Sequence, residues 1–166
     1  MEGYLILVEE IFGQLVEEKQ ANSITHVFLQ AGVGGFAAAM AALIRKKFQQ
    51  SLQIIVVEPS SASTLFESIK NKKPTKVFGA DSVMGRLDCK EPSLSAFYSL
   101  SRTSNYFMHI SDEYVQKKIN FLNSLGIKTS ASGGAGLAGL IYASNNQLFD
   151  IDKNSKALVF LTEGAI

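Results

Sequence analysis

The segment HVFLQAGVGGFAAAM, residues 26–40, decides the fold. It begins with a nearly continuous apolar run, typical of a strand that is buried on both faces. Gly32, Gly34 and Gly35 follow, and an alanine-rich helix is predicted from Phe36 to Phe48. Such a loop aims backbone N–H groups and the positive end of a helix dipole at one point, which favours a bound phosphate. A tight turn that only lets the helix pack closely on the sheet explains these glycines equally well.

A second apolar run, QIIVVE at 53–58, follows this helix and predicts a strand. Strand, helix and strand of these lengths form a βαβ unit, whose two strands are parallel. An amphipathic helix is predicted before the first strand. Further along we expect a helix from Ser60 to Lys70, a short strand at 76–79, a helix from Ser93 to about Thr103, a strand at 105–111, a helix between Ser111 and Gly126, a helix after the glycines of SASGGAG at 130–136, and a last strand in KALVFL at 156–161. The alternation predicts a single α/β domain over residues 1–166 with a parallel sheet.

The composition indicates a cytoplasmic protein. Lys and Arg number 16 and Asp and Glu 15, so the formal charge of +1 favours neither nucleic acid nor an anionic membrane as a partner. The N-terminal helix carries glutamates and lacks the features of an export signal, and no apolar run is long enough to span a bilayer. The single cysteine, Cys89, excludes an intrachain disulfide, and no His cluster beside it indicates zinc.

The glycine loop also satisfies a dinucleotide-binding pattern. Gly32, Gly34 and Ala37 match G-x-G-x-x-A, and Glu58 ends the next strand, where an acid that binds ribose belongs. An NAD-dependent oxidoreductase is therefore an alternative. Against it, a helix precedes the first strand, Glu58 is followed by Pro59 and a serine-rich stretch, and the segments SGGAG and TEG would have no role.

Five segments occur in the order, and at about the spacing, found in a known family. They are THVFLQAGVGG at 25–35, VVEPSSAS at 56–63, DSVMGRLDCKEPS at 81–93, SASGGAG at 130–136 and VFLTEG at 159–164. In these segments the chain resembles the fold-type II pyridoxal-phosphate enzymes, most closely the diaminopropionate ammonia-lyases. The resemblance runs from about Gly3 to Gly164, and its middle segment is the most specific. It implies a three-layer fold similar to tryptophan synthase β, present here incompletely.

The resemblance also implies a site and a reaction. The phosphate of pyridoxal 5′-phosphate would be held by the glycine loop, and the ring nitrogen would meet a hydroxyl at the exit of the last strand. A neutral hydroxyl does not force protonation of the ring, which suits an elimination. The reaction implied is α,β-elimination of ammonia from 2,3-diaminopropionate, a small amino acid, followed by hydrolysis to pyruvate and a second ammonia. A homodimer is implied as well. The residues assigned to the cofactor are Ala31, Gly32, Val33, Gly34, Gly35 and Thr162.

The chain departs from the family pattern at particular positions. Gly134 stands where the family carries a carboxylate, and Leu161 replaces a serine that commonly precedes the threonine. Glu58 matches a glutamate that helps to coordinate a cation in some fold-type II enzymes. Thr64, however, stands where a second acidic ligand would be useful, so we assign no metal site.

A pyridoxal-phosphate enzyme needs a lysine that forms a Schiff base with the cofactor. In fold-type II enzymes it lies upstream of the glycine loop, where this chain has only Lys19, on the polar side of the first helix. The downstream lysines, such as Lys46, Lys90 and Lys117, lie in polar helix or loop contexts. We therefore expect the C-terminal portion of a longer chain, active only with its upstream half. A non-catalytic remnant or anion-binding module is the alternative, as is a plain α/β domain with no ligand.

Overall fold

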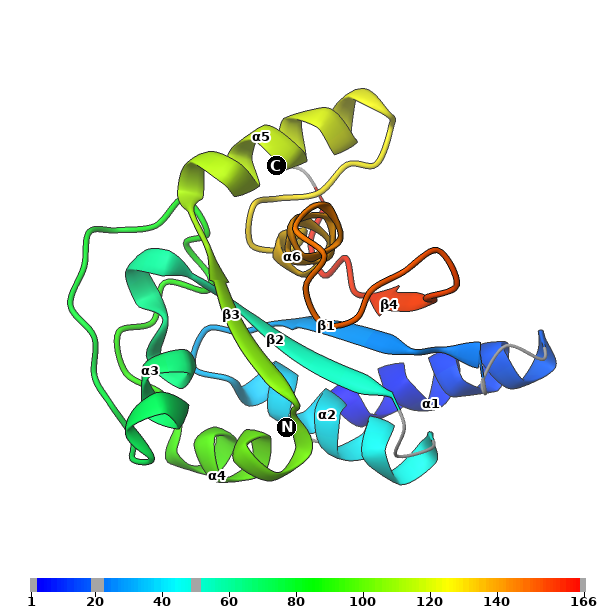
Figure 1. Ribbon diagram of the computed structural model, residues 1–166, viewed down its shortest axis with the longest axis horizontal. Coiled ribbons are helices and arrows are strands. Elements are labelled where there is room, and N and C mark those ends of the chain that lie inside the picture. Colours follow the sequence, from blue (N-terminus) through cyan, green and yellow to red (C-terminus); the bar gives the residue numbers. More distant parts are fainter. Residues whose placement is uncertain (1–2, 19–22, 49–51, 165–166) are drawn as a thin grey trace.

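The fold is built on a parallel sheet of four strands, and the computed structural model describes residues 3–18, 23–48 and 52–164. The strand order is β3-β2-β1-β4, and all three pairings are parallel (Figure 1). The strands are β1 (His26–Gln30), β2 (Gln53–Pro59), β3 (Tyr106–Ile110) and β4 (Ala157–Val159). The predicted βαβ unit is confirmed, since β1 and β2 pair in parallel around the helix that follows the glycine loop.

Helices cover both faces of the sheet. Figure 1 shows one group of helices on one face and a second group on the other. The first group is α1 (Gly3–Glu17), α2 (Gly35–Lys47), α3 (Thr64–Asn71) and α4 (Leu94–Thr103). The second group is α5 (Asp112–Ser124) and α6 (Ala135–Asn145). The predicted three-layer α/β fold is therefore confirmed. No helix among the described residues is long and apolar enough to cross a membrane.

Two apolar cores lie on opposite faces of the sheet, because successive strand residues point to opposite sides. From β1, Val27 and Leu29 join the core under α2 and α4, where Ile11, Phe12 and Leu15 of α1 also pack. Phe28 joins the core under α5 and α6. Strands that are buried on both faces need apolar residues at nearly every position, which explains why the sequence of β1 and β2 does not alternate.

Two sequence predictions are wrong in detail. Ser60 does not cap a helix: a 3-10 turn covers Ser60–Ala62, and α3 begins only at Thr64. The buried carboxylate of Glu58 satisfies the start of α3 instead, because it accepts the N–H groups of Leu65 at 2.8 Å and Phe66 at 2.7 Å. The strand expected at 76–79 is irregular chain. There the N–H of Val77 donates to the Lys90 carbonyl at 2.9 Å, within a loop and outside the sheet.

The other helix starts agree with the sequence. Ser93 accepts the Ala96 N–H at the start of α4, and Ser111 accepts the Tyr114 N–H at the start of α5. Gly126 lies just beyond α5 with φ +83°, a left-handed conformation that glycine adopts readily and that ends helices. The starts of α4 and α5 are thus set by a capping side chain within three residues. The start of α3 is set by Glu58, which lies six to eight residues before the groups that it accepts from.

The environment of Glu58 predicts a pH-dependent stability. Burial raises the pKa of Glu58 to about 8, against the lowering effect of the N–H groups of Leu65 and Phe66. Because this pKa lies above that of the unfolded chain, the folded state binds an extra proton, and stability is lost as the pH rises from about 5 to about 8. Glu58→Gln, which does not titrate, should reduce this loss by a few kcal/mol. Urea unfolding across this range measures it, and equal slopes for both proteins would contradict it.

Candidate functional site

A cavity of about 490 Å³ opens at the carboxyl ends of β1 and β4. The order in which strands join the sheet reverses between these two strands: β2 and β3 lie on one side of β1, and β4 lies on the other. In open parallel sheets ligands bind at such a reversal of strand order, beyond the carboxyl ends of the strands. All six residues assigned to the cofactor line this cavity, namely Ala31, Gly32, Val33, Gly34, Gly35 and Thr162.

The glycine loop presents unpaired backbone donors to the cavity. Among the described residues, the N–H groups of Gly32, Val33, Gly34 and Gly35 donate to no acceptor. The loop is anchored through its other groups, since the Val33 carbonyl accepts the Ser93 N–H at 2.9 Å. Free N–H groups at the start of a helix suit an anion with several oxygens, such as a phosphate. The N–H of Ala31 instead donates to the Val57 carbonyl at 2.9 Å, so Ala31 contributes only to the cavity wall.

The three loop glycines meet different surroundings. A Cβ at Gly34, where φ is +95°, would lie 2.8 Å from the Cβ of Ala96, so this glycine permits the turn and the packing of α2 on α4. A Cβ at Gly32 would lie 3.0 Å from the Sγ of Cys89. A Cβ at Gly35 would meet nothing within 4 Å. Gly34 is therefore the glycine that the turn and the helix packing require, whereas Gly35 faces open space that a ligand could occupy.

The hydroxyl of Thr162 lies on the other side of the cavity, just beyond β4. Its Oγ1 accepts a hydrogen bond of 3.2 Å from the side-chain amide of Gln30, which ends β1. Gln30 is only 3% exposed and also lines the cavity. The sequence prediction missed Gln30, although a polar side chain at the end of an otherwise apolar buried strand was a usable signal.

A loop at 79–92 forms a further wall of the cavity and supplies Arg86, Leu87 and Cys89. Arg86 pairs with Glu163 across the cavity rim, with 2.9 Å between Nε and Oε1. The other carboxylate oxygen of Glu163 accepts the Ser130 hydroxyl at 2.5 Å. None of these residues was assigned to the site from the sequence. Their contacts depend on the pairing of β4 with β1, which the sequence does not show.

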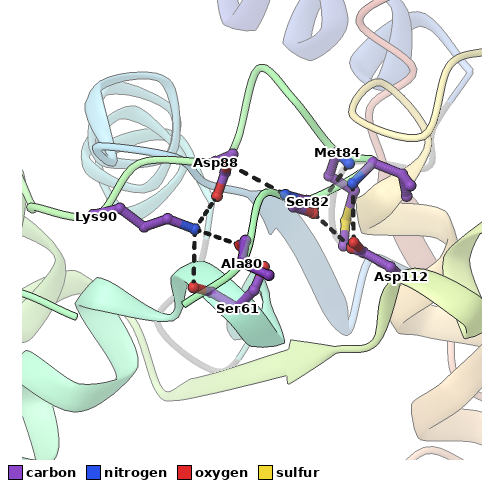
Figure 2. A network of polar contacts seen from close by, with 8 residues as sticks. Ser61, Ala80, Ser82, Met84, Asp88, Lys90 and Asp112 are labelled. Carbon is purple, nitrogen blue, oxygen red and sulfur yellow. Dashed lines mark hydrogen bonds and ion pairs between the residues drawn. The ribbon is translucent and has the colours of Figure 1, made fainter. Parts of the chain in front are cut away.

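A polar network holds this wall loop in place (Figure 2). The ammonium of Lys90 donates to the carbonyls of Ser61 at 3.1 Å and Ala80 at 2.9 Å, and to the carboxylate of Asp88. The hydrogen bond from Lys90 lowers the pKa of Asp88. At the other end of the network, Asp112 in the first turn of α5 accepts the Ser82 hydroxyl at 2.6 Å. The wall loop is thus tied both to the turn after β2 and to α5.

The same contacts exclude Lys90 as a lysine that reacts with a cofactor. An ammonium has three hydrogens, and Lys90 directs them to three acceptors. Within the described ranges, no lysine lines the cavity. Lys19 lies outside the described residues, so the structure does not place it.

Replacing Lys90 by methionine should loosen the wall loop. The change leaves two carbonyls and the Asp88 carboxylate without their donor, which costs about 1–3 kcal/mol. Because the Arg86 side chain is 74% exposed, trypsin cleavage after Arg86 should become faster. Lys76→Met is the matched control, since the Lys76 side chain makes, among the described residues, only an exposed ion pair of 3.7 Å with Glu91. Equal cleavage rates in the two variants would show that the network does not hold the loop.

Glu58 is not available to a ligand in this cavity. It is fully buried, both of its oxygens serve the start of α3, and it is absent from the cavity lining. The NAD alternative required the Glu58 carboxylate to bind ribose. Because Glu58 does not reach the cavity, that alternative lacks its ribose-binding acid. Among the described residues, no group of three or more His, Cys, Asp or Glu side chains could hold a metal ion.

The departure at Gly134 has a packing cause. A Cβ there would lie 2.4 Å from the Cδ1 of Ile119 and 2.9 Å from the Cγ2 of Thr129. A carboxylate side chain at this position would require the side chains of Ile119 and Thr129 to shift. The second departure, Leu161, is 45% exposed beside Thr162.

Residues 1–163 match the sequence model of one protein family, described as pyridoxal-phosphate dependent enzyme. This chain belongs to the pyridoxal-phosphate dependent enzyme family. Within that family it is 30% identical to a diaminopropionate ammonia-lyase from Salmonella typhimurium, over 99% of this chain and 45% of the relative. The chain thus spans about half the length of the curated relatives that it matches.

Solved structures of pyridoxal-phosphate enzymes share this fold. The Escherichia coli diaminopropionate ammonia-lyase, in complex with an aminoacrylate–PLP azomethine reaction intermediate, matches with a TM-score of 0.85 and 27% identity. The match covers 99% of this chain and 44% of that one. Maize serine racemase matches with a TM-score of 0.84 at 18% identity, over 99% of this chain and 49% of that chain, which supports the fold alone. The fold is that of the fold-type II pyridoxal-phosphate enzymes.

Proposed function

We propose that this chain binds pyridoxal 5′-phosphate in the cavity beyond β1 and β4. The phosphate would accept the N–H groups of Gly32, Val33, Gly34 and Gly35, and the ring nitrogen would lie against the Thr162 hydroxyl. The observation that carries the proposal is the row of backbone donors without acceptors at one side of a cavity whose other side presents a hydroxyl. These groups fit the cofactor, because an anion suits the helix start and a neutral polar atom suits the hydroxyl.

The reaction proposed for the whole protein is the elimination of ammonia from 2,3-diaminopropionate, which yields pyruvate and a second ammonia after hydrolysis. The bound cofactor supplies an electron sink for the carbanion that forms at Cα of the substrate. The residues of this chain hold and orient it: the glycine loop fixes the phosphate, Thr162 fixes the ring edge, and the 79–92 loop closes one wall. The similarity to diaminopropionate ammonia-lyases supports this substrate.

The lysine that binds the cofactor covalently would come from a segment outside this chain. Two observations support this: no lysine among the described residues lines the cavity, and the relatives are about twice as long as this chain. We propose that residues 1–166 form one α/β domain, the C-terminal portion of a longer protein. That protein would work in the cytoplasm as a homodimer, or by association with an upstream half.

Reconstitution tests the activity. The chain is fused behind the part of the Salmonella relative that it does not span, and pyruvate and ammonia are measured with 2,3-diaminopropionate. We expect turnover that disappears when Gly35→Val blocks the loop and persists in the control Gly13→Val, whose Cβ on α1 also meets nothing within 4 Å. A well-folded fusion that binds the cofactor but releases neither product would refute the lyase proposal and favour a non-catalytic anion-binding module.

A further inference from the structure

Gln30 has the most buried polar side chain among the residues that line the cavity. Its Nε2 carries two hydrogens and faces three acceptors, so one hydrogen is shared: the carbonyls of Phe160 at 3.0 Å and Gly133 at 3.2 Å, and the Oγ1 of Thr162 at 3.2 Å. These partners lie on the last strand and on the loop before α6. We propose that Gln30 is a positioning residue, which fixes the Thr162 hydroxyl as a hydrogen-bond donor toward the cavity.

The two backbone carbonyls determine which end of the amide is the nitrogen. A carbonyl can only accept, so the side of Gln30 that faces Phe160 and Gly133 must be the N–H₂ group. With the amide reversed, Oε1 would lie against two carbonyl oxygens at about 3 Å. The nitrogen also faces Thr162, and because an amide nitrogen cannot accept, the hydroxyl gives no hydrogen to Gln30 and its oxygen shares one of the two amide hydrogens.

The other end of the amide shows that this orientation is maintained at a cost. Gln30 Oε1 is buried and has no hydrogen-bond partner among the described residues. A buried acceptor without a donor is unfavourable, and such groups are rare in folded proteins. Gly136 in α6 leaves the space for this oxygen, since a Cβ there would lie 2.7 Å from it. A leucine or methionine would remove this orphaned oxygen but would also take the amide donor from the carbonyls of Phe160 and Gly133, so the acceptors of the N–H₂ group hold the amide in this orientation.

The consequence concerns the proton of Thr162. The hydroxyl accepts from Gln30 and, within the described part of the chain, donates to no acceptor. Its hydrogen is therefore free to point into the cavity that Thr162 lines. If the cofactor binds as proposed above, the cofactor atom beside Thr162 meets a hydrogen-bond donor, the Thr162 hydroxyl. A pyridine nitrogen placed there is held as an unprotonated acceptor.

The test uses pyridoxal phosphate labelled with ¹⁵N in the ring, bound to the purified chain and to Gln30→Met, Thr162→Val and the double variant. In the unaltered chain, the resonance should report an unprotonated, hydrogen-bonded nitrogen. Gln30→Met should move the resonance toward that of Thr162→Val and weaken binding about threefold to tenfold, as for one lost neutral hydrogen bond. In the Thr162→Val background, Gln30→Met should change the resonance no further, because Gln30 acts through the hydroxyl.

The outcomes separate this inference from the proposed function. If the cofactor binds and the resonance is the same with and without the Gln30 amide, the positioning role is wrong and the proposed function stands. If the unaltered chain shows no saturable binding, both fail. Should Gln30→Met not fold, Gly136→Ala takes its place, because the added Cβ pushes the amide aside without lining the cavity. An unshifted resonance in Gly136→Ala would overturn the role equally.

Discussion

Replacing Gly35 by valine is expected to weaken the binding of pyridoxal phosphate by at least about 100-fold, with an unchanged melting temperature. The Cβ of this residue would enter open space at the start of α2, beside N–H groups that lack acceptors. The valine methyl groups would occupy the position of the phosphate oxygens and remove several charge-assisted hydrogen bonds, each worth about 1.5–3 kcal/mol. Fluorescence titration with pyridoxal phosphate measures the affinity.

Gly13→Val is the matched control for this change. Gly13 lies in α1, and a Cβ there also meets nothing within 4 Å, so the two variants add the same side chain to open space. Only the variant at 35 should lose affinity. Equal affinities of the two variants would mean that the loop at 32–35 does not hold the phosphate.

Replacing Gly34 by alanine is expected to destabilise the fold by about 2–5 kcal/mol. Part of this is the left-handed backbone, with φ +95°, which costs a residue with a Cβ about 1–2 kcal/mol. The rest arises because the new methyl group would lie 2.8 Å from the Cβ of Ala96 and 3.0 Å from the Cδ1 of Leu65, an overpacked contact that costs about 1–3 kcal/mol. Urea unfolding measures the total, and the melting temperature should fall by roughly 5–15 °C.

Gly126→Ala separates the two contributions. Gly126 also has a positive φ, of +83°, but a Cβ there meets nothing within 4 Å. It should therefore lose only the conformational part, about 1–2 kcal/mol. If Gly34→Ala costs no more than Gly126→Ala, the close packing of the glycine loop on α4 does not contribute to stability.

Most of the architecture could be predicted from the sequence because it depends on local patterns. The apolar runs of β1 and β2, the alanine-rich helix between them and the caps Ser93 and Ser111 are signals within a few residues of the element that they determine. The start of α3 could not be predicted in this way. It depends on the Glu58 carboxylate, which accepts N–H groups seven and eight residues further along the chain.

The candidate site was predicted where consecutive residues build it and missed where the fold brings distant ones together. The glycine loop is a local motif, and Thr162 was named by a resemblance. Gln30 and Glu163 reach the cavity because β4 pairs with β1 across more than a hundred residues of chain. The wall loop at 79–92 is positioned by Lys90, whose acceptors at Ser61 and Ala80 are carbonyls that no sequence pattern marks.

The central claim is that this chain binds the phosphate and ring nitrogen of pyridoxal phosphate but contributes no lysine to the cavity. Titration of the purified chain with pyridoxal phosphate, followed by borohydride reduction and mass mapping of labelled lysines, tests it most directly. We predict saturable binding that requires the phosphate group, with no lysine labelled stoichiometrically. Stoichiometric labelling of one lysine would contradict the claim, because the chain would then hold a complete cofactor site, and the absence of saturable binding would refute the phosphate site itself.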